Sequence, residues 1–257
     1  MLRVCAVNYL NTVPLVWGML HGPQRGLFDL SFATPSKCAD AVAANQADIG
    51  IVPSIELETQ DLAIVPGLGI ASMGPVRSIL LVAKVPPREI RVLAADASSR
   101  TSVALTRIVL AERYGAEPRM ISHPPDLPAM LAAADAALII GDPALHLNPD
   151  TLPYHVYDLG REWTQMTGLP MVFAVWAGRQ SCITPEVTGI FRASYTYGMR
   201  HTDEILDLDA IPRGFARDLA RRYLCEHIKY ELGPAAYEGM DLFRRLGRRF
   251  LPARSEA

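Results

Sequence analysis

The sequence has 257 residues, of which 50% are hydrophobic and 20% are charged, and its formal net charge is −2 at pH 7. This composition excludes a mostly disordered protein, because so apolar a chain can bury a core. The near-neutral charge argues against a dedicated nucleic-acid-binding protein, which would carry a basic stripe. At roughly 100–200 residues per domain, the length allows one large domain or two small ones.

Signals for export and for metal binding are missing from the sequence. Polar Asn8 and Asn11 follow Met1 so closely that no apolar signal-peptide core fits between them. No apolar run approaches the roughly 18 residues of a membrane span. The four cysteines and six histidines lack the spacing of a zinc site or a redox dithiol. We therefore expect a cytoplasmic protein with no metal and no membrane or nucleic-acid partner.

Short apolar runs alternate with amphipathic stretches from the first residues onward, a pattern typical of a mainly parallel α/β sheet. Strands are expected at residues 2–7, 30–33, 48–52, 62–65, 78–85, 90–94, 136–140, 154–158 and 169–176. Helices are expected at residues 12–20, 35–44, 102–114, 160–167, 185–201, 213–232 and 234–249. The last three helices form a helical C-terminal tail, with Phe191, Tyr195, Phe215, Leu219, Tyr223 and Phe243 as its expected core.

These elements divide into two α/β series, each smaller than a usual domain. We therefore predict an α/β protein of two lobes joined by two hinge crossings. Residues 1–85 and 178–257 are expected in the first lobe and residues 86–177 in the second. The cleft between the lobes is the expected ligand site, because strand ends and helix N-termini converge in such clefts.

The first strand-to-helix junction carries Asn11 and Thr12. Either side chain could cap the helix that follows, in which Pro14 suits the first turn. Alternatively, the junction exposes amide N–H groups and the Asn11 carboxamide to a ligand in the cleft. The sequence leaves both interpretations open.

A cluster of hydroxyl side chains opens the long helix of the second series. It consists of Ser98, Ser99, Thr101 and Ser102, which is more than one N-cap requires. Hydroxyls and free amides at the positive end of a helix suit a carboxylate or a phosphate, so we predict an anion site here. Arg100, in the same turn, is either part of that site or a surface charge.

Three further polar residues stand at predicted strand ends. Asp142 follows the apolar strand 136–140 and is either the N-cap of a short helix or an acceptor for a substrate hydroxyl. Ser54 follows the strand 48–52, and Ser78 opens a crossing strand. Each of the three is a candidate for the wall of the cleft.

Taken together, five ordered segments resemble the chorismate dehydratase family, which begins the futalosine route to menaquinone. The segments are YLNT at residues 9–12, SRTSVAL at 99–105, IGD at 140–142, TGLP at 167–170 and VFAVW at 172–176. No single segment is specific, but the ordered set is, and the resemblance covers residues 1–180.

This resemblance implies a periplasmic-binding-protein type II fold, a two-lobed flytrap used here as an enzyme. It implies a hydro-lyase that converts chorismate to 3-[(1-carboxyvinyl)oxy]benzoate and water with no metal or organic cofactor. Two alternatives stay open. One is 1,4-dihydroxy-6-naphthoate synthase of the same route, which shares the fold and is expected to use a cleft histidine. The other is a solute-binding protein, which would bind a metabolite unchanged.

Turning chorismate into an aromatic product removes the proton on ring carbon C3 and the hydroxyl group on C4, so the reaction needs a base. Asp142 is the one carboxylate among the candidate residues, but the substrate carries its own carboxylate on the enolpyruvyl ether at C3. We therefore predict substrate-assisted elimination, with Asn11 and Ser78 as catalytic residues that orient the enolpyruvyl group or the leaving hydroxyl. The predicted substrate-binding residues are Thr12, Ser54, Ser98, Ser99, Arg100, Thr101, Ser102 and Asp142.

Overall fold

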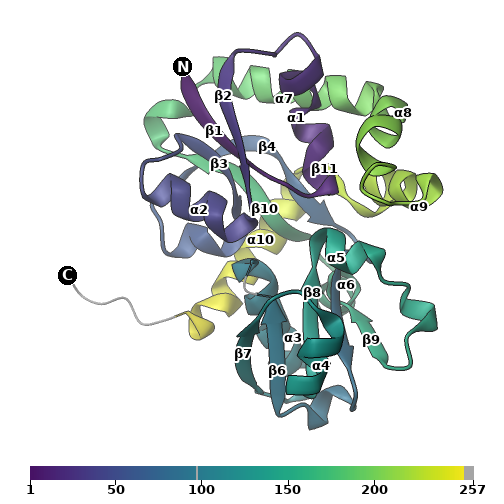
Figure 1. Ribbon diagram of the computed structural model, residues 1–257. Helices are drawn as coiled ribbons and strands as arrows, with labels where there is room; N and C mark the ends of the chain where they lie inside the picture. The colour runs from purple at the N-terminus through teal and green to yellow at the C-terminus, as the bar shows by residue number, and fades with distance from the viewer. Residues whose placement is uncertain (97, 252–257) are drawn as a thin grey trace.

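Two β-sheets organise the chain in the computed structural model, which describes residues 1–96 and 98–251 (Figure 1). The first sheet has the order β11-β4-β10-β3-β1-β2 and consists of β1 (Leu2–Val7), β2 (Phe28–Ala33), β3 (Ile49–Pro53), β4 (Ala63–Ser72), β10 (Met171–Gly178) and β11 (Lys229–Glu231). The second sheet has the order β7-β6-β8-β5-β9 and consists of β5 (Ile79–Ala83), β6 (Val92–Asp96), β7 (Arg119–His123), β8 (Ala136–Ile140) and β9 (His155–Asp158).

Helices accompany each sheet, and the two groups form two lobes (Figure 1). The first lobe contains α1 (Val13–His21), α2 (Pro35–Ala43), α7 (Pro185–Arg200), α8 (Thr202–Ile205) and α9 (Arg217–Arg222). The second contains α3 (Arg100–Tyr114), α4 (Leu127–Ala133), α5 (Gly141–His146) and α6 (Leu159–Thr167). The shorter 3₁₀ and π turns are η1 (Leu10–Thr12), η2 (Ser54–Glu58), η3 (Pro87–Glu89), η4 (Pro149–Thr151), η5 (Gln180–Cys182), η6 (Leu206–Ala210), η7 (Tyr223–His227) and η8 (Arg248–Phe250).

The last helix, α10 (Pro234–Gly247), ties the lobes together and is drawn in yellow in Figure 1. It packs against β10 and η2 of the first lobe and against α3 of the second. Its Phe243 ring meets the Trp163 ring of α6 edge to face, with the ring centroids 6.0 Å apart. The tail therefore returns to the junction of the lobes instead of ending on the first lobe alone.

The pairing of β1 explains why polar junctions gather at one edge of the first sheet. β1 pairs in parallel with both β2 and β3, so these strands end at the same edge. The turns that follow β1 and β3 meet the second lobe there, through hydrogen bonds from the Leu10 N–H to Asp142 and from the Ile55 N–H to Thr101. This edge therefore faces the space between the lobes.

Two segments cross between the lobes: residues 73–78, from β4 to β5, and residues 168–170, from α6 to β10. The predicted boundaries after residues 85 and 177 differ from this division. β5 pairs with β8 and β9 in the second sheet, whereas β10 pairs with β3 and β4 in the first. Both strands are wholly buried apolar runs, whose composition suits either sheet, so the sequence does not reveal which lobe they join.

The first crossing is held in an uncommon backbone conformation. Arg77 has a φ of 70°, a left-handed value that is costly for a residue with a Cβ atom. The Asp158 carboxylate accepts hydrogen bonds from the N–H groups of Val76 at 2.9 Å and Arg77 at 2.6 Å. It also caps α6 by accepting from the Arg161 N–H at 3.1 Å. One acid thus fixes the backbone immediately before Ser78.

The C-terminal tail departs from the prediction in one segment. The prediction of a single helix over residues 213–232 is wrong. In the structure, α9 and η7 are followed by the strand β11, which pairs antiparallel with β4. Lys229, Tyr230 and Glu231 are exposed, buried and exposed in turn, the two-residue period of a half-buried strand. Of the expected core residues, Phe191, Phe215, Tyr223 and Phe243 are buried, and Tyr195 and Leu219 are half-buried.

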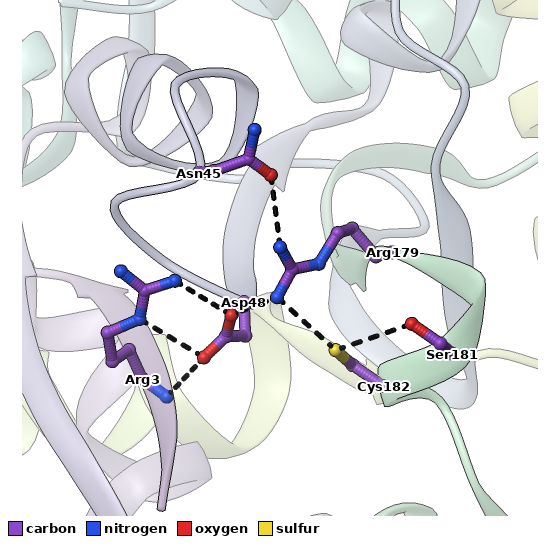
Figure 2. A network of polar contacts seen from close by, with 6 residues as sticks. All are labelled: Arg3, Asn45, Asp48, Arg179, Ser181 and Cys182. Atoms are coloured by element: carbon purple, nitrogen blue, oxygen red, sulfur yellow. Dashed lines mark hydrogen bonds and ion pairs between the residues drawn. The ribbon is translucent and has the colours of Figure 1, made fainter.

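An ion-pair network closes the opposite edge of the first sheet, away from the cleft (Figure 2). The Asp48 carboxylate accepts from the Arg3 N–H at 2.8 Å and from the Arg3 guanidinium, and it also pairs with Arg179. The Arg3 hydrogen bonds lower the pKa of Asp48 to about 2. The network joins the start of β1 to the loops that precede β3 and follow β10.

Two of the four cysteines lie in contact, although their spacing predicted no pair. All four are free thiols, and the Sγ atoms of Cys5 in β1 and Cys38 in α2 lie 3.2 Å apart in the core. Their hydrogen bond lowers the pKa of the Cys5 thiol. The contact arises because α2 packs against β1, a tertiary arrangement that the sequence separation does not encode.

Candidate active site

A cavity lies between the lobes, at the carboxyl end of β1. It contains about 500 Å³ of space between the protein atoms, part of which is open to solvent. Its apolar wall includes Val7, Ile51, Ile70, Val76, Ile79, Ile140 and Phe173. Its polar side chains are those of Tyr9, Asn11, Ser78, Ser99 and Ser102.

The polar wall of the cavity is uncharged. Among the described residues that line it, Tyr9 alone has a side chain that ionises, and burial raises the pKa of Tyr9 above its usual value. The Tyr9 hydroxyl therefore stays protonated near neutral pH. The cavity offers hydroxyl and carboxamide groups to a ligand, with no carboxylate, imidazole or ammonium group among these lining residues.

Asn11 and Thr12 stand in η1, directly after β1, and are both buried. The capping interpretation is wrong for them, since Thr12 occupies the N-cap position of α1 without a side-chain hydrogen bond to it. Instead, the Thr12 hydroxyl donates to Asn11 Oδ1 at 3.4 Å. Asn11 is thereby held with its side chain in the wall of the cavity.

Ser78 stands at the end of the first crossing and is 1% exposed. Its Oγ accepts a hydrogen bond of 2.8 Å from the hydroxyl of Tyr223, which belongs to η7 in the tail. Burial raises the pKa of Tyr223, against the lowering effect of hydrogen bonds with Ser78 and Asn11. The sequence assigned Tyr223 only to the core; its polar hydroxyl, which needs a partner when buried, was the available signal.

The N-terminus of α3 forms the facing wall. The Ser99 hydroxyl caps the helix by accepting from the Ser102 N–H at 3.2 Å, and it donates to Ser102 Oγ at 2.8 Å. The Ser98 Oγ atom lies 3.2 Å from the hydroxyl oxygen of Tyr9. Thr101 is turned away from the cavity lining and accepts from the Ile55 N–H at 3.3 Å.

Arg100 and Ser54 make contacts away from the cavity lining. The Arg100 guanidinium pairs with Glu56 at 2.9 Å and with Asp40 at 2.6 Å, so two carboxylates already neutralise its charge. The Ser54 hydroxyl, which is fully buried, donates to the carbonyl oxygen of Val172 in β10 at 2.7 Å. Both side chains stabilise the junction between elements in this structure.

Asp142 bridges the two lobes. Its Oδ1 accepts from the Leu10 N–H at 2.9 Å, and its Oδ2 accepts from Arg213 at 3.0 Å. The N-cap of α5 is Ile140, so the capping interpretation of Asp142 is wrong. Burial raises the pKa of Asp142, partly offset by its hydrogen bond to Leu10 and by the Arg213 charge. Both carboxylate oxygens are engaged by protein donors.

Tyr9 reaches across the cleft to the second lobe. Its ring lies over Gly141, where an added Cβ atom would come within 2.6 Å of the ring, and Gly141 has a φ of 64°. Position 141 therefore requires glycine for two reasons: the backbone has a left-handed conformation, and the Tyr9 ring leaves no space for a Cβ atom.

Asp96, at the end of β6, was not predicted as a site residue. It is 1% exposed, its Oδ1 accepts from the Ser98 N–H at 2.9 Å, and its Oδ2 has no partner among the described residues. Burial raises the pKa of Asp96. It lies behind the α3 wall and is not among the residues that line the cavity.

Comparison with known proteins identifies the family. A family model described as menaquinone biosynthesis matches residues 2–249. The chain belongs to the menaquinone biosynthesis family. It is also 30% identical, over 264 aligned positions, to a chorismate dehydratase of Thermus thermophilus, and the match covers 95% of each chain.

Solved structures support the predicted fold of this menaquinone biosynthesis chain. A protein of Archaeoglobus fulgidus matches with a TM-score of 0.79 and 16% identity over 97% of each chain. The periplasmic aliphatic sulphonate binding protein of Escherichia coli matches with a TM-score of 0.64 and 15% identity, over 97% of this chain and 86% of that one. The predicted two-lobed, periplasmic-binding-protein type of fold is confirmed.

Residues 1–96 and 98–251 lack two further features. Within these ranges, no group of three or more His, Cys, Asp or Glu side chains is arranged to hold a metal ion. No helix there is both long and apolar enough to cross a membrane.

The structure divides the predicted site residues of this family member into two groups. Those that line the cavity are Asn11, Ser78, Ser99 and Ser102. Those that lie outside its lining are Thr12, Ser54, Ser98, Arg100, Thr101 and Asp142. Apart from Thr12, whose partner is the neighbouring Asn11, the side chains of the second group have partners in distant parts of the sequence, which local motifs do not predict.

Proposed function

We propose that this chain is a chorismate dehydratase, a hydro-lyase that converts chorismate to 3-[(1-carboxyvinyl)oxy]benzoate and water in menaquinone biosynthesis. The observation that carries this proposal is the 30% identity to a chorismate dehydratase over 95% of both chains. The family match over residues 2–249 supports the same pathway. A soluble metabolite as substrate also fits our proposal that the protein is cytoplasmic.

The walls of the cavity suit the two ends of such a substrate. Chorismate is a dianion, and the cavity offers donors on opposite sides: Ser99 and Ser102 at the N-terminus of α3, and Asn11 with Ser78 on the other wall. A helix N-terminus favours a carboxylate without a basic side chain. We assign the ring carboxylate to the α3 wall, and the enolpyruvyl group to Asn11 and Ser78.

The uncharged wall favours substrate-assisted elimination. Asp142, the predicted alternative base, is held by the Leu10 N–H and Arg213 and does not line the cavity. In the proposed step, the enolpyruvyl carboxylate takes the proton from C3, the C3–H electron pair forms the ring double bond, and the C4–O bond breaks. The leaving oxygen then takes this proton from the enolpyruvyl carboxylic acid and departs as water, which restores the carboxylate. Positioning and electrostatic stabilisation are then the protein's contribution.

Incubation of the purified protein with chorismate tests this proposal. We expect an aromatic product whose mass is lower than that of chorismate by one water. Each protein molecule should form many product molecules, as a catalyst does. Asn11→Ala serves as the control for turnover in this cavity and is expected to form product far more slowly. Chorismate that binds and is recovered unchanged would instead indicate a solute-binding protein and overturn the proposal.

A further inference from the structure

Tyr223 has a hydroxyl group that the packing of its ring does not require. The residue is 1% exposed, and its ring lies in the main core, where a phenylalanine would fill the same space. Its hydroxyl nevertheless reaches Ser78, which lines the cavity. It donates to Ser78 Oγ at 2.8 Å.

The direction of this hydrogen bond decides what Ser78 can still do. Tyr223 has a single O–H, and it points to Ser78 Oγ. Ser78 then receives a hydrogen bond and keeps its own O–H free for another acceptor.

The cavity is where that remaining O–H can find an acceptor. Ser78 lines the cavity and is otherwise buried, and the structure describes no second protein partner for its hydroxyl. Chains of hydrogen bonds polarise one another, so a donor behind Ser78 strengthens the hydrogen bond that Ser78 makes in front. The crossing that carries Ser78 is fixed by Asp158, which holds the hydroxyl at its place.

We propose that Tyr223 is a positioning residue, which fixes the Ser78 hydroxyl as a hydrogen-bond donor toward an oxygen atom of the bound substrate. This inference rests on the proposed function, because it assigns Tyr223 to the same reaction. Tyr223 does not touch the substrate and acts through Ser78. Through Tyr223, the C-terminal tail thus takes part in a site whose polar lining side chains all come from the first half of the sequence.

Replacing Tyr223 by phenylalanine removes only the hydroxyl. We expect Tyr223→Phe to lower kcat for chorismate by roughly 10- to 100-fold while KM changes by less than about threefold, because a Ser78 hydroxyl that is no longer fixed holds the enolpyruvyl carboxylate less well against the C3 proton. Tyr230→Phe is the matched control. Tyr230 is also a buried tyrosine of the tail, but its hydroxyl has no partner among the described residues. We expect Tyr230→Phe to keep the kcat of the unmodified protein.

A double-mutant cycle separates positioning from mere packing. If Tyr223 acts through Ser78, then Ser78→Ala combined with Tyr223→Phe is no slower than Ser78→Ala alone. Equal kcat values for Tyr223→Phe and the unmodified protein, or losses that multiply in the double variant, would overturn the inference. Failure of the unmodified protein to dehydrate chorismate would overturn the proposed function instead, before any variant is compared.

A second measurement does not depend on the folding of Tyr223→Phe. In the unmodified protein, the Tyr223 hydroxyl proton is expected to give a protected NMR signal that shifts when 3-[(1-carboxyvinyl)oxy]benzoate binds. Ser78→Ala should abolish this shift while leaving the Tyr230 signals in place. A signal that does not respond to the product in the unmodified protein would show that the two hydroxyl groups are not linked to the ligand.

Discussion

Asp142 illustrates how partners decide what a side chain can do. At the end of a buried strand, a carboxylate is a reasonable base, and burial does raise the pKa of Asp142. Yet its two oxygens accept hydrogen bonds from the Leu10 N–H and from Arg213, one on each side. A lone pair that already binds a cation is poorly suited to remove a proton from carbon.

Substitutions of Asn11 and Asp142 should therefore have different effects. Asn11→Ala is expected to lower kcat by roughly 100-fold or more, the usual effect of removing a donor from a preorganised site. Asp142→Asn retains an oxygen acceptor for the Leu10 N–H and should stay within roughly tenfold of the unmodified protein. Steady-state rates of chorismate loss provide the comparison. An inactive Asp142→Asn protein that still binds the product normally would make Asp142 the base.

The pH dependence of kcat/KM distinguishes a protein base from a substrate base. Burial raises the pKa values of both Asp96 and Asp142, so either one, acting as base, would become protonated and lose activity as the pH falls through that raised value. The substrate's own carboxylate has no such environment to raise its pKa before binding. We expect kcat/KM to be nearly constant from about pH 5 to 8. A tenfold fall per pH unit within this range would contradict substrate assistance.

At the scale of elements, the N-terminus of α3 combines a structural and a binding role in adjacent residues. Ser102 faces the cavity and receives a hydrogen bond from Ser99, which leaves its own O–H free. Thr101 instead accepts from the Ile55 N–H and links the lobes. The hydroxyl cluster was predicted from the run of serine and threonine residues at a helix start, but the direction of each side chain depends on the helical turn and on η2 across the cleft.

Alanine at these two positions should separate the roles. Ser102→Ala is expected to weaken product binding by roughly 1–3 kcal/mol, the value of a hydrogen bond to a charged group. Thr101→Ala leaves the buried Ile55 N–H without its acceptor, so its main effect should be a lower melting temperature. Isothermal titration calorimetry and thermal unfolding measure the two quantities. If Thr101→Ala weakens binding as much as Ser102→Ala, the assignment of the carboxylate to Ser102 is wrong.

Local patterns predicted the elements well where one helix or strand decides the outcome. β1 and β8 match their predicted bounds, and Asn11 was found because a strand-to-helix junction is a contiguous feature. Tyr223 was missed because its hydroxyl partner, Ser78, is 145 residues away. The same limit applies to β5 and β10, whose burial was visible in the sequence but whose sheet was not.

At the scale of the whole molecule, the lobes touch across the cleft. Tyr9 meets Ser98 and lies over Gly141, and Arg213 of the tail binds Asp142 of the second lobe. These contacts border the cavity that we assign to chorismate, and their separation would widen the path into it. We therefore expect an open form that closes on the substrate, a common device in two-lobed proteins.

Gly141→Ala tests the role of lobe closure. The added Cβ atom would meet the Tyr9 ring at 2.6 Å, so closure should be disfavoured and kcat/KM should fall by at least tenfold. Gly115→Ala is the matched control, because Gly115 has nearly the same φ, 65°, with nothing within 4 Å of the added atom. Both variants should lose stability by about 1 kcal/mol from backbone strain. Equal activities would show that the Tyr9 contact is dispensable for the reaction.

An amide analogue of chorismate tests the central claim most directly, namely that this cavity dehydrates chorismate with the substrate's own carboxylate as base. The analogue carries a carboxamide in place of the enolpyruvyl carboxylate and therefore lacks the proposed proton acceptor. Product formation from chorismate and from the analogue is followed side by side by proton NMR. We predict that chorismate is converted to the aromatic product and that the analogue binds without reacting. Dehydration of the analogue at a rate comparable to that of chorismate, or no dehydration of chorismate itself, would contradict the claim.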